Sequence, residues 1–235
     1  MIMPRIFFLF FLFLLHSCSQ SSDAFLQKGK TLMKEGKTKE AIEFINKAIE
    51  KNTSSAEAFN LRGVAYYELK EYDNALLDFN QAVKLAPESY RAYFNRGLLY
   101  TDENKLDSAL NNYNEAARLA PDTADIFLNR GQLYALLDQP EQAIPDFEKA
   151  TRLDENNAQA WYNLGNTYFR RKDYKKATLA FRQTIRLDGK NGKAFYGLAM
   201  AQWNDGEKDI SCTTFRQALD LGYSDAQVAL AQYCR

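Results

Sequence analysis

Few residues in this chain could do chemistry, and their positions limit which chemistry that is. The 235 residues include three cysteines, Cys18, Cys212 and Cys234, and one histidine, His16. His16 lies in the first seventeen residues, a segment that we expect to be removed as a signal peptide. The remaining chain would then lack the commonest general base and the commonest metal ligand. A Ser-His-Asp or Cys-His catalytic arrangement and an imidazole zinc site would be excluded.

The acidic and glycine residues give no catalytic pattern either. Adjacent acids such as Asp102 and Glu103 are typical of solvated turns, and the glycines form no phosphate-binding loop. With 30 Lys and Arg against 30 Asp and Glu, the chain has no general attraction to nucleic acid. We therefore expect a protein that is not an enzyme, needs no cofactor or metal, and binds no nucleic acid.

The N-terminus carries a targeting signal. After Arg5, residues 6–15 (IFFLFFLFLL) are entirely apolar, and ten helical residues cover only about half of a ~30 Å hydrocarbon core. The following Leu15-His16-Ser17-Cys18 resembles the lipobox of bacterial lipoproteins, although His16 replaces the usual small residue. The resemblance implies a signal peptide over 1–17, lipid on Cys18, and a short lipid-anchored linker over 18–21. An ordinary signal peptide, or a short anchor with an incidental cysteine, is the alternative.

This resemblance also implies a location. Ser19 stands where an aspartate would retain a lipoprotein in the inner membrane of enteric bacteria. We therefore expect an outer-membrane lipoprotein of the bacterial cell envelope that faces the periplasm, with surface exposure as the open alternative.

The rest of the chain is repetitive, with a step of 34 residues. The repeating positions hold small residues (Ala41, Ala75, Ala109, Ala143, Ala177, Ser211), glycines (Gly29, Gly63, Gly97, Gly131, Gly165, then Ala199) and rings (Phe79, Tyr113, Phe147, Phe181, Phe215). Inside a unit these residues are spaced by 3, 4 and 7, which places them on one stripe of a helix. Two such stripes separated by a polar turn predict an antiparallel helix pair, and pairs that cannot bury their faces alone must stack.

The pattern resembles the tetratricopeptide repeat family. The fifth unit, Trp161-x-x-Leu164-Gly165-x-x-Tyr168 followed by Ala177 and Phe181, is closest to the family pattern. The resemblance implies an all-α solenoid of six helix-turn-helix repeats over 22–223, with units at 22–55, 56–89, 90–123, 124–157, 158–191 and 192–225. A capping helix follows over 224–235. Pro145 falls inside a second helix, where we expect a tolerated kink on the outer face.

The two remaining cysteines flank this last hairpin. Cys212 and Cys234 are each eleven residues from Tyr223, so an antiparallel pair of helices would place them side by side. In an exported chain a disulfide is favoured, and two buried free thiols are the alternative.

The family resemblance implies that the first helix of each repeat lines a concave groove. Transferred position by position, the predicted partner-binding residues are Asn60, Tyr67, Phe94, Asn95, Asn129, Tyr162, Asn163, Asn166, Phe169, Tyr196 and Trp203. The Lys, Asn and Arg set that clamps a terminal carboxylate in some members is missing. Recurring amides can bond an extended backbone without reading its sequence, and the rings suit an apolar or amphipathic segment. Alternatively, the rings only pack between neighbouring first helices.

A basic stretch is the other notable surface. Its members are Arg170, Arg171, Lys172, Lys175 and Lys176, with Arg182 and Arg186 nearby. Most such runs are solvated turns, and the alternative is docking of an acidic partner or of anionic lipid headgroups.

These features together predict a lipid-anchored envelope scaffold that binds a protein or peptide partner and supports assembly or stability of an envelope complex. In layout it resembles the short repeat lipoproteins that help to build outer-membrane machines or pilus secretin rings. A self-associating structural solenoid, which would be a homo-oligomer, and a glycan-binding envelope protein are the alternatives.

The lipid anchor gives the first testable prediction. The Cys18→Ser variant should move from the membrane pellet to the soluble fraction with its fold intact, because several acyl chains hold a lipoprotein on the membrane. Cell fractionation and circular dichroism measure the two effects. A variant that stays bound like an integral protein would contradict the prediction and favour the short anchor.

Overall fold

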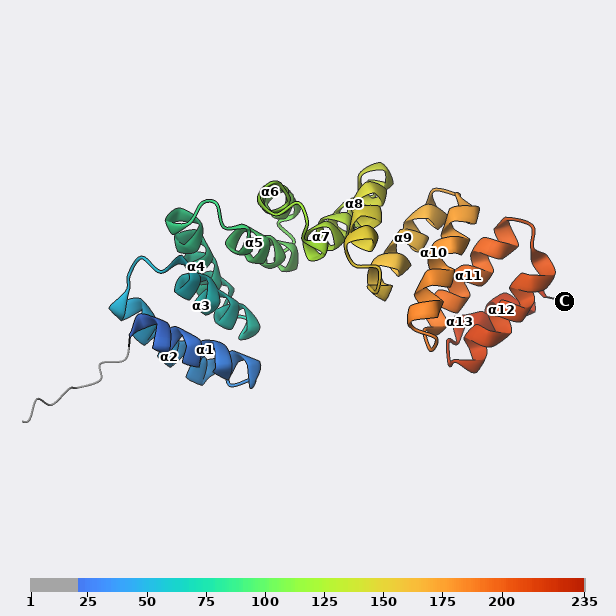
Figure 1. Cartoon of the computed structure of the whole chain (residues 1–235). Helices are drawn as coiled ribbons and strands as arrows, with labels where there is room; N and C mark the ends of the chain where they lie inside the picture. Colours follow the sequence, from blue (N-terminus) through green and yellow to red (C-terminus); the bar gives the residue numbers. More distant parts are fainter. Residues whose placement is uncertain (1–20, 235) are drawn as a thin grey trace, which may run out of the picture.

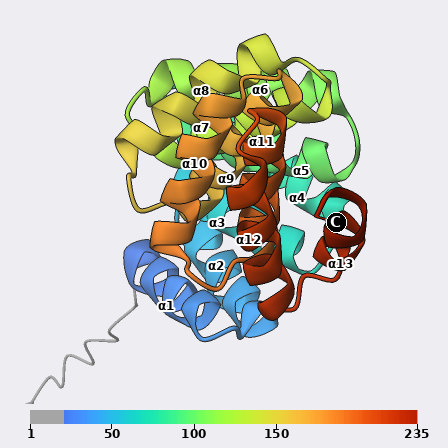
Figure 2. The ribbon, with the colours of Figure 1, turned by 90° about the vertical axis from the view of Figure 1, so that its right-hand side faces the viewer.

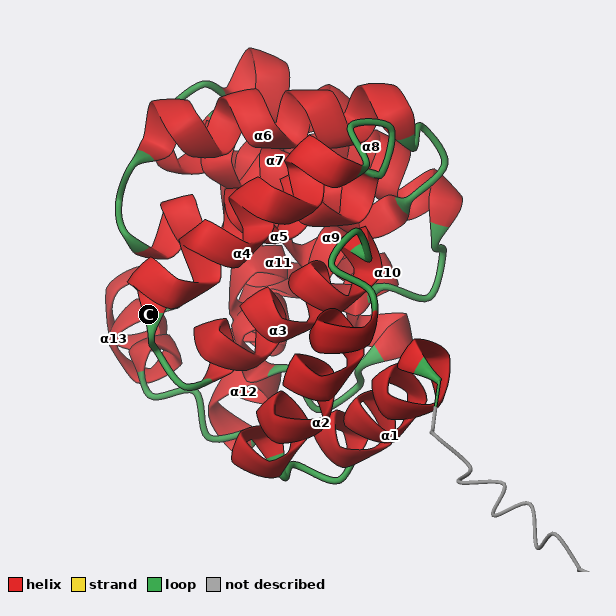
Figure 3. Cartoon of the chain, turned by 90° about the vertical axis from the view of Figure 1, so that its left-hand side faces the viewer, coloured by secondary structure: helices red, strands yellow, loops and turns green. Residues whose placement is uncertain are grey.

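The computed structural model describes residues 21–234, and every regular element in that range is an α-helix (Figure 3). The first twelve helices form six antiparallel pairs, and the thirteenth stands alone at the end. They are α1 (Ser22–Lys34), α2 (Thr38–Lys51), α3 (Ala56–Glu68), α4 (Tyr72–Leu85), α5 (Tyr90–Asp102), α6 (Leu106–Leu119), α7 (Ala124–Leu136), α8 (Pro140–Leu153), α9 (Ala158–Arg170), α10 (Tyr174–Leu187), α11 (Gly192–Asn204), α12 (Lys208–Asp220) and α13 (Asp225–Tyr233).

Local sequence explains where the helices begin. Several first helices are capped by a side chain that accepts a hydrogen bond from the backbone N–H three residues on. Ser55 caps α3 in this way, Asn157 caps α9 and Asn191 caps α11. Each cap satisfies one of the backbone donors that the first turn of a helix leaves unpaired.

The turn inside each pair uses a left-handed residue at a position that repeats every 34 residues. These residues are Gly36, Lys70, Asn104, Asp138, Lys172 and Gly206, with φ between 57° and 92°. The next N–H then bonds back to a carbonyl of the first helix, as Asp173 N–H does to Tyr168 O at 2.9 Å. This geometry satisfies the carbonyls at the helix end and reverses the chain.

Within a pair, the two helices approach closely because a glycine on the first lies under a ring on the second. A Cβ atom on Gly63 would lie 2.6 Å from a ring carbon of Phe79, and one on Gly165 would lie 2.9 Å from Phe181. The rings are almost wholly buried, with Phe79 1% and Phe181 0% exposed. The 34-residue step in the sequence is therefore the step of this ring-on-glycine contact.

The pairs stack into an arch whose inner side is formed by first helices (Figure 1). In that view α3, α5 and α7 lie toward the inside of the arch, with α4, α6 and α8 outside. Neighbouring first helices touch one another, and each second helix packs on the first helix of the next repeat. The predicted fold class, an all-α repeat solenoid with a capping helix, is confirmed.

The end of the array is closed by α13, which lies beside α12 (Figure 2). Ala226 and Ala229 are buried against α12, and the ring of Tyr233 stacks on Phe215 with 6.2 Å between centroids. Cys212 of α12 and Cys234, directly after α13, form a disulfide with a Cα–Cα distance of 5.6 Å. The last helix is therefore held by both packing and a covalent link.

Two further expectations concern the chain's ends and its interior proline. Helix α8 runs without interruption through Pro145, which lies on the exposed face. Cys18 and the predicted signal peptide over 1–17 lie outside the described residues. No helix within 21–234 has the length and apolar character needed to cross a membrane.

The disulfide gives the second prediction. Reduction should lower the unfolding midpoint, because freeing the end of α13 removes a constraint on the unfolded chain worth ~3 kcal/mol. Thermal unfolding with and without reductant measures this, and a Cys212→Ser, Cys234→Ser double variant should show no effect of reductant. If the Cys18→Ser variant, denatured without reductant, exposed two reactive thiols, the link would be absent.

Candidate functional site

The residues predicted to bind a partner all lie on first helices. Helix α3 carries Asn60 and Tyr67, α5 carries Phe94 and Asn95, α7 carries Asn129, α9 carries Tyr162, Asn163, Asn166 and Phe169, and α11 carries Tyr196 and Trp203. All eleven side chains are half-buried. They divide into residues that are already engaged within the chain and residues that face open space.

In the N-terminal half, polar groups on neighbouring first helices bond to one another. The Asn95 amide donates to Asn60 Oδ1 at 3.0 Å, and the Tyr67 hydroxyl donates to Asp102 Oδ2 at 2.5 Å. Burial, reinforced by Asp102, raises the pKa of Tyr67, so its hydroxyl keeps the proton that it donates. These side chains join consecutive repeats along the inner side of the array.

The aromatic residues at the predicted groove positions also have contacts within the chain. Phe94 packs on Tyr113, Tyr162 on Phe181, Phe169 on Tyr174, and Tyr196 on both Phe215 and Tyr223, at centroid distances of 5.0–6.0 Å. The partner rings belong to the second helix of the same repeat or to the turn after α12, rather than to the neighbouring first helix. One edge of each ring is therefore anchored and the remainder is exposed.

The C-terminal half contains a pocket between the first helices α7 and α9, which we call the inner pocket. It encloses about 300 Å³ and is lined by Gln132, Ala135, Leu136, Phe147, Asn163, Asn166, Thr167 and Arg170. Asn163 accepts a hydrogen bond from Gln159 at 2.9 Å, whereas its buried Nδ2 has no hydrogen-bond partner. The Nδ2 of Asn163 is therefore a donor beside this pocket whose hydrogen-bonding capacity is not used within residues 21–234.

Other predicted residues have different surroundings. The Asn129 amide donates to the Asp125 carbonyl of its own helix at 2.8 Å. Trp203 lies 4.8 Å from the ring of Tyr233, in a pocket beside the disulfide, so it belongs to the capped end of the array. The structure therefore brings Asn163 and Asn166 together and places Trp203 apart from them.

The basic stretch is partly neutralised by neighbouring acids. Arg170 binds Asp138 and the Ala135 carbonyl of the preceding repeat. Asp173 lies 3.9 Å from Arg171 and 3.8 Å from Lys176. Lys175, Arg182 and Arg186 on α10 form no ion pair within residues 21–234, whereas Lys176 on the same helix does.

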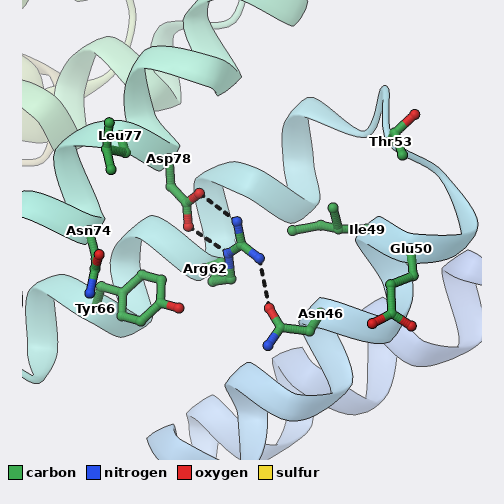
Figure 4. Close-up of a pocket in the computed structure, with 9 residues that line it drawn as sticks. All are labelled: Asn46, Ile49, Glu50, Thr53, Arg62, Tyr66, Asn74, Leu77 and Asp78. Carbon is green, nitrogen blue, oxygen red and sulfur yellow. Dashed lines mark hydrogen bonds and ion pairs between the residues drawn. The ribbon is translucent and has the colours of Figure 1, made fainter.

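A polar contact that the sequence analysis missed joins three helices at a time (Figure 4). Arg62 of α3 donates two hydrogen bonds to Asp78 of α4, at 2.7 and 2.8 Å, and one to Asn46 of α2 at 2.7 Å. Its guanidinium also lies over the Phe59 ring. We call this arrangement an arginine lock, because it ties a repeat to the one before it.

The lock recurs at the 34-residue step. Arg96 donates hydrogen bonds to Asn80 and Asn112, and Arg130 donates to Asn114 and Asp146. In each case one partner lies sixteen residues before the arginine and the other sixteen residues after it. The hydrogen bonds that each guanidinium donates to its aspartate raise the pKa of Arg62 and of Arg130, so both stay charged. Arginines at a fixed step flanked by Asp or Asn at sixteen residues were the signal that could have revealed it.

No group of three or more His, Cys, Asp or Glu side chains among residues 21–234 is arranged to hold a metal ion.

Comparison with known proteins agrees with this architecture. Models of the tetratricopeptide repeat match residues 22–52, 56–89 and 128–192, and a further TPR repeat model matches 97–138. The chain belongs to the tetratricopeptide repeat family. No relative is found among curated protein sequences.

Solved structures show the same fold at low sequence identity. PilF of Pseudomonas aeruginosa is 22% identical with a TM-score of 0.78, covering 88% of this chain and 97% of its own. YrrB, described as a TPR protein with an unusual peptide-binding site, is 22% identical with a TM-score of 0.70, covering 75% and 91%. MamA is 21% identical with a TM-score of 0.67, covering 73% and 94%.

The arginine lock gives the third prediction. Arg130→Ala should lower the free energy of unfolding by about 3 kcal/mol, because it leaves the carboxylate of Asp146 buried without its partner. Denaturant unfolding measures the loss. Arg118→Ala, which breaks an exposed ion pair with Glu115, is the control and should have a much smaller effect, because solvent screens an exposed pair. Equal effects of the two substitutions would show that the lock contributes nothing special.

Proposed function

We propose that this protein is a non-enzymatic scaffold of the bacterial cell envelope, anchored by lipid on Cys18. It holds an apolar or amphipathic peptide segment of a protein partner on the inner side of the arch, and so supports assembly or stability of an envelope complex.

The observation that carries the proposal is the inner pocket. Its buried, unpaired Asn163 Nδ2 provides a donor for a peptide carbonyl, and Asn166 lies beside it in the same lining. Half-exposed rings follow along the same side of the array at Tyr162, Phe169 and Tyr196. An extended peptide segment can be held by hydrogen bonds from such amides to its backbone and by packing of its apolar side chains on such rings.

Three further points support it. The N-terminal part of the inner surface uses its amides and the Tyr67 hydroxyl within the chain, which leaves the C-terminal repeats as the binding region. YrrB, which shares the fold, is described as having a peptide-binding site. The absence of a histidine after residue 16 agrees with a protein that binds rather than catalyses.

The fourth prediction tests the binding region. A photo-crosslinking amino acid at Tyr196 should capture the partner in cells, and the captured protein then serves as the ligand. Asn163→Ala combined with Tyr196→Ala should weaken its binding by roughly tenfold or more, because anchors in concave surfaces dominate affinity. Calorimetry measures the affinity.

The control is Asn129→Ala, at the same position one repeat earlier, where the amide already bonds its own helix. This variant should bind almost as well as the unchanged protein. Thermal unfolding of each variant shows whether the fold is kept. If the double variant binds normally while Arg170→Ala with Arg171→Ala does not, the inner side of the arch is the wrong surface.

A further inference from the structure

Helix α9 has a second pocket on its opposite side. Asn163, Asn166 and Arg170 face the inner pocket, whereas Trp161, Leu164 and Tyr168 face a cavity of about 340 Å³ between α8 and α10. We call this cavity the outer pocket. Its remaining lining is Glu148, Thr151, Arg152, Lys176, Leu179 and Ala180. It lies between two second helices, and therefore on the outer side of the arch.

The outer pocket occupies the place where the arginine lock stands in earlier repeats. The equivalent space one hundred and two residues earlier is the pocket of Figure 4, which measures about 540 Å³ and is lined by Arg62 with its bonds to Asp78 and Asn46. Leu164 replaces the arginine, Ala180 replaces the aspartate, and Glu148 replaces the asparagine. The Tyr168 hydroxyl donates to Glu148, so that carboxylate is already engaged. The change therefore replaces the charged arginine lock by an apolar floor of Leu164 and Ala180.

The surroundings of the cavity carry unpaired positive charge. Lys175, Leu179, Arg182 and Arg186 follow one another at spacings of four, three and four along the exposed face of α10, and Arg152 lies on the rim. Helix α10 has no acidic residue. Within residues 21–234, these four cations form no ion pair or side-chain hydrogen bond. The matching stripe on α4, formed by Asp73, Leu77, Asn80 and Lys84, has no net charge.

The shape of the site argues for a peptide rather than a membrane surface. Leu179 is 62% exposed at the edge, while Leu164 is 4% and Ala180 2% exposed at the floor. The cavity therefore receives an apolar group instead of projecting one, as membrane insertion would need. Its volume is at the lower end of ligand pockets and suits one or two large side chains.

We propose that the outer pocket binds an acidic peptide segment through one large apolar anchor residue. The anchor enters between Trp161, Leu164 and Leu179, and flanking carboxylates pair with the cations of α10 and with Arg152. This site is separate from the inner pocket, so the chain can hold two segments on opposite sides of α9.

The test uses a short fluorescein-labelled peptide with a central Phe between runs of Glu, titrated with the full chain and followed by anisotropy. Leu179→Asp should weaken binding by roughly tenfold, because it places a carboxylate at the mouth of the pocket. The control is Leu77→Asp, which alters an equally exposed leucine (68%) at the matching position of repeat two and should leave binding unchanged. The peptide with Lys for Glu, or Ser for Phe, should not bind.

A second variant rebuilds the lock. Leu164→Arg with Ala180→Asp should replace the apolar floor of the cavity by the ion pair seen in repeat two and abolish peptide binding, and the unfolding midpoint of this variant shows whether the fold is kept. Arg182→Glu with Arg186→Glu should weaken binding and flatten its dependence on salt. Tyr196→Ala, on the inner side, should leave this peptide's affinity unchanged.

The opposite results would overturn the proposal. No binding of the acidic peptide, or equal affinities for Leu179→Asp and Leu77→Asp, would show that the cavity is not a peptide site. Binding to vesicles of phosphatidylglycerol and phosphatidylcholine tests whether the cations instead contact an anionic membrane. If Leu179→Asp reduced binding to these vesicles and not to the peptide, the surface would be a membrane contact.

Discussion

The whole array depends on one kind of contact, a large side chain of the second helix lying directly on a small residue of the first, which in repeats two to five is a ring on a glycine. At Gly63 and Phe79 the separation leaves no room for a Cβ atom, and the contact recurs through Gly165 and Phe181. Close-packed interiors tolerate added volume poorly, so this contact fixes how near the two helices lie. Where Ala199 replaces the glycine, in the last repeat, Phe215 is still wholly buried. The helix pair is therefore the rigid unit from which the arch is built.

Side-chain polar bonds then decide which parts of the surface are free. Along the inner side, Asn60, Asn95 and Tyr67 join consecutive first helices in the N-terminal repeats. Along the outer side, Arg62 and its equivalents join consecutive second helices. The arginine lock stops before repeat five, whose inner contact with repeat four is made by Arg170, bound to Asp138 and to the Ala135 carbonyl. Repeat five has an unpaired amide inside, at Asn163, and an apolar cavity outside.

This distribution links stability to binding. In a repeat tied to its neighbour by an arginine lock, the polar groups of the outer side are bonded within the chain. Repeat five gives up the lock, and Tyr168 bonded to Glu148 takes its place on one side of the cavity. Burial, with Glu148 beside it, raises the pKa of Tyr168, so the hydroxyl remains a donor and the pair stays intact. The positions that hold repeats together in the N-terminal half are therefore the ones at which we propose partner binding in repeat five.

The sequence by itself determined the helix pairs, their number and their order. The glycine, the small residue and the ring recur every 34 residues because they contact one another inside one repeat. The sequence also predicted the disulfide between Cys212 and Cys234, since both lie equally far from the turn at Tyr223. It could not separate the eleven predicted groove residues into engaged and open ones, because that depends on contacts between repeats. Only the tertiary structure showed that the Asn95 amide is bonded to Asn60 while the Nδ2 of Asn163 is not. The arginines of the lock recur in the sequence every 34 residues, but their hydrogen bonds could not be inferred from it. Their partners lie on two other helices, which only the stacking of repeats brings within hydrogen-bond distance.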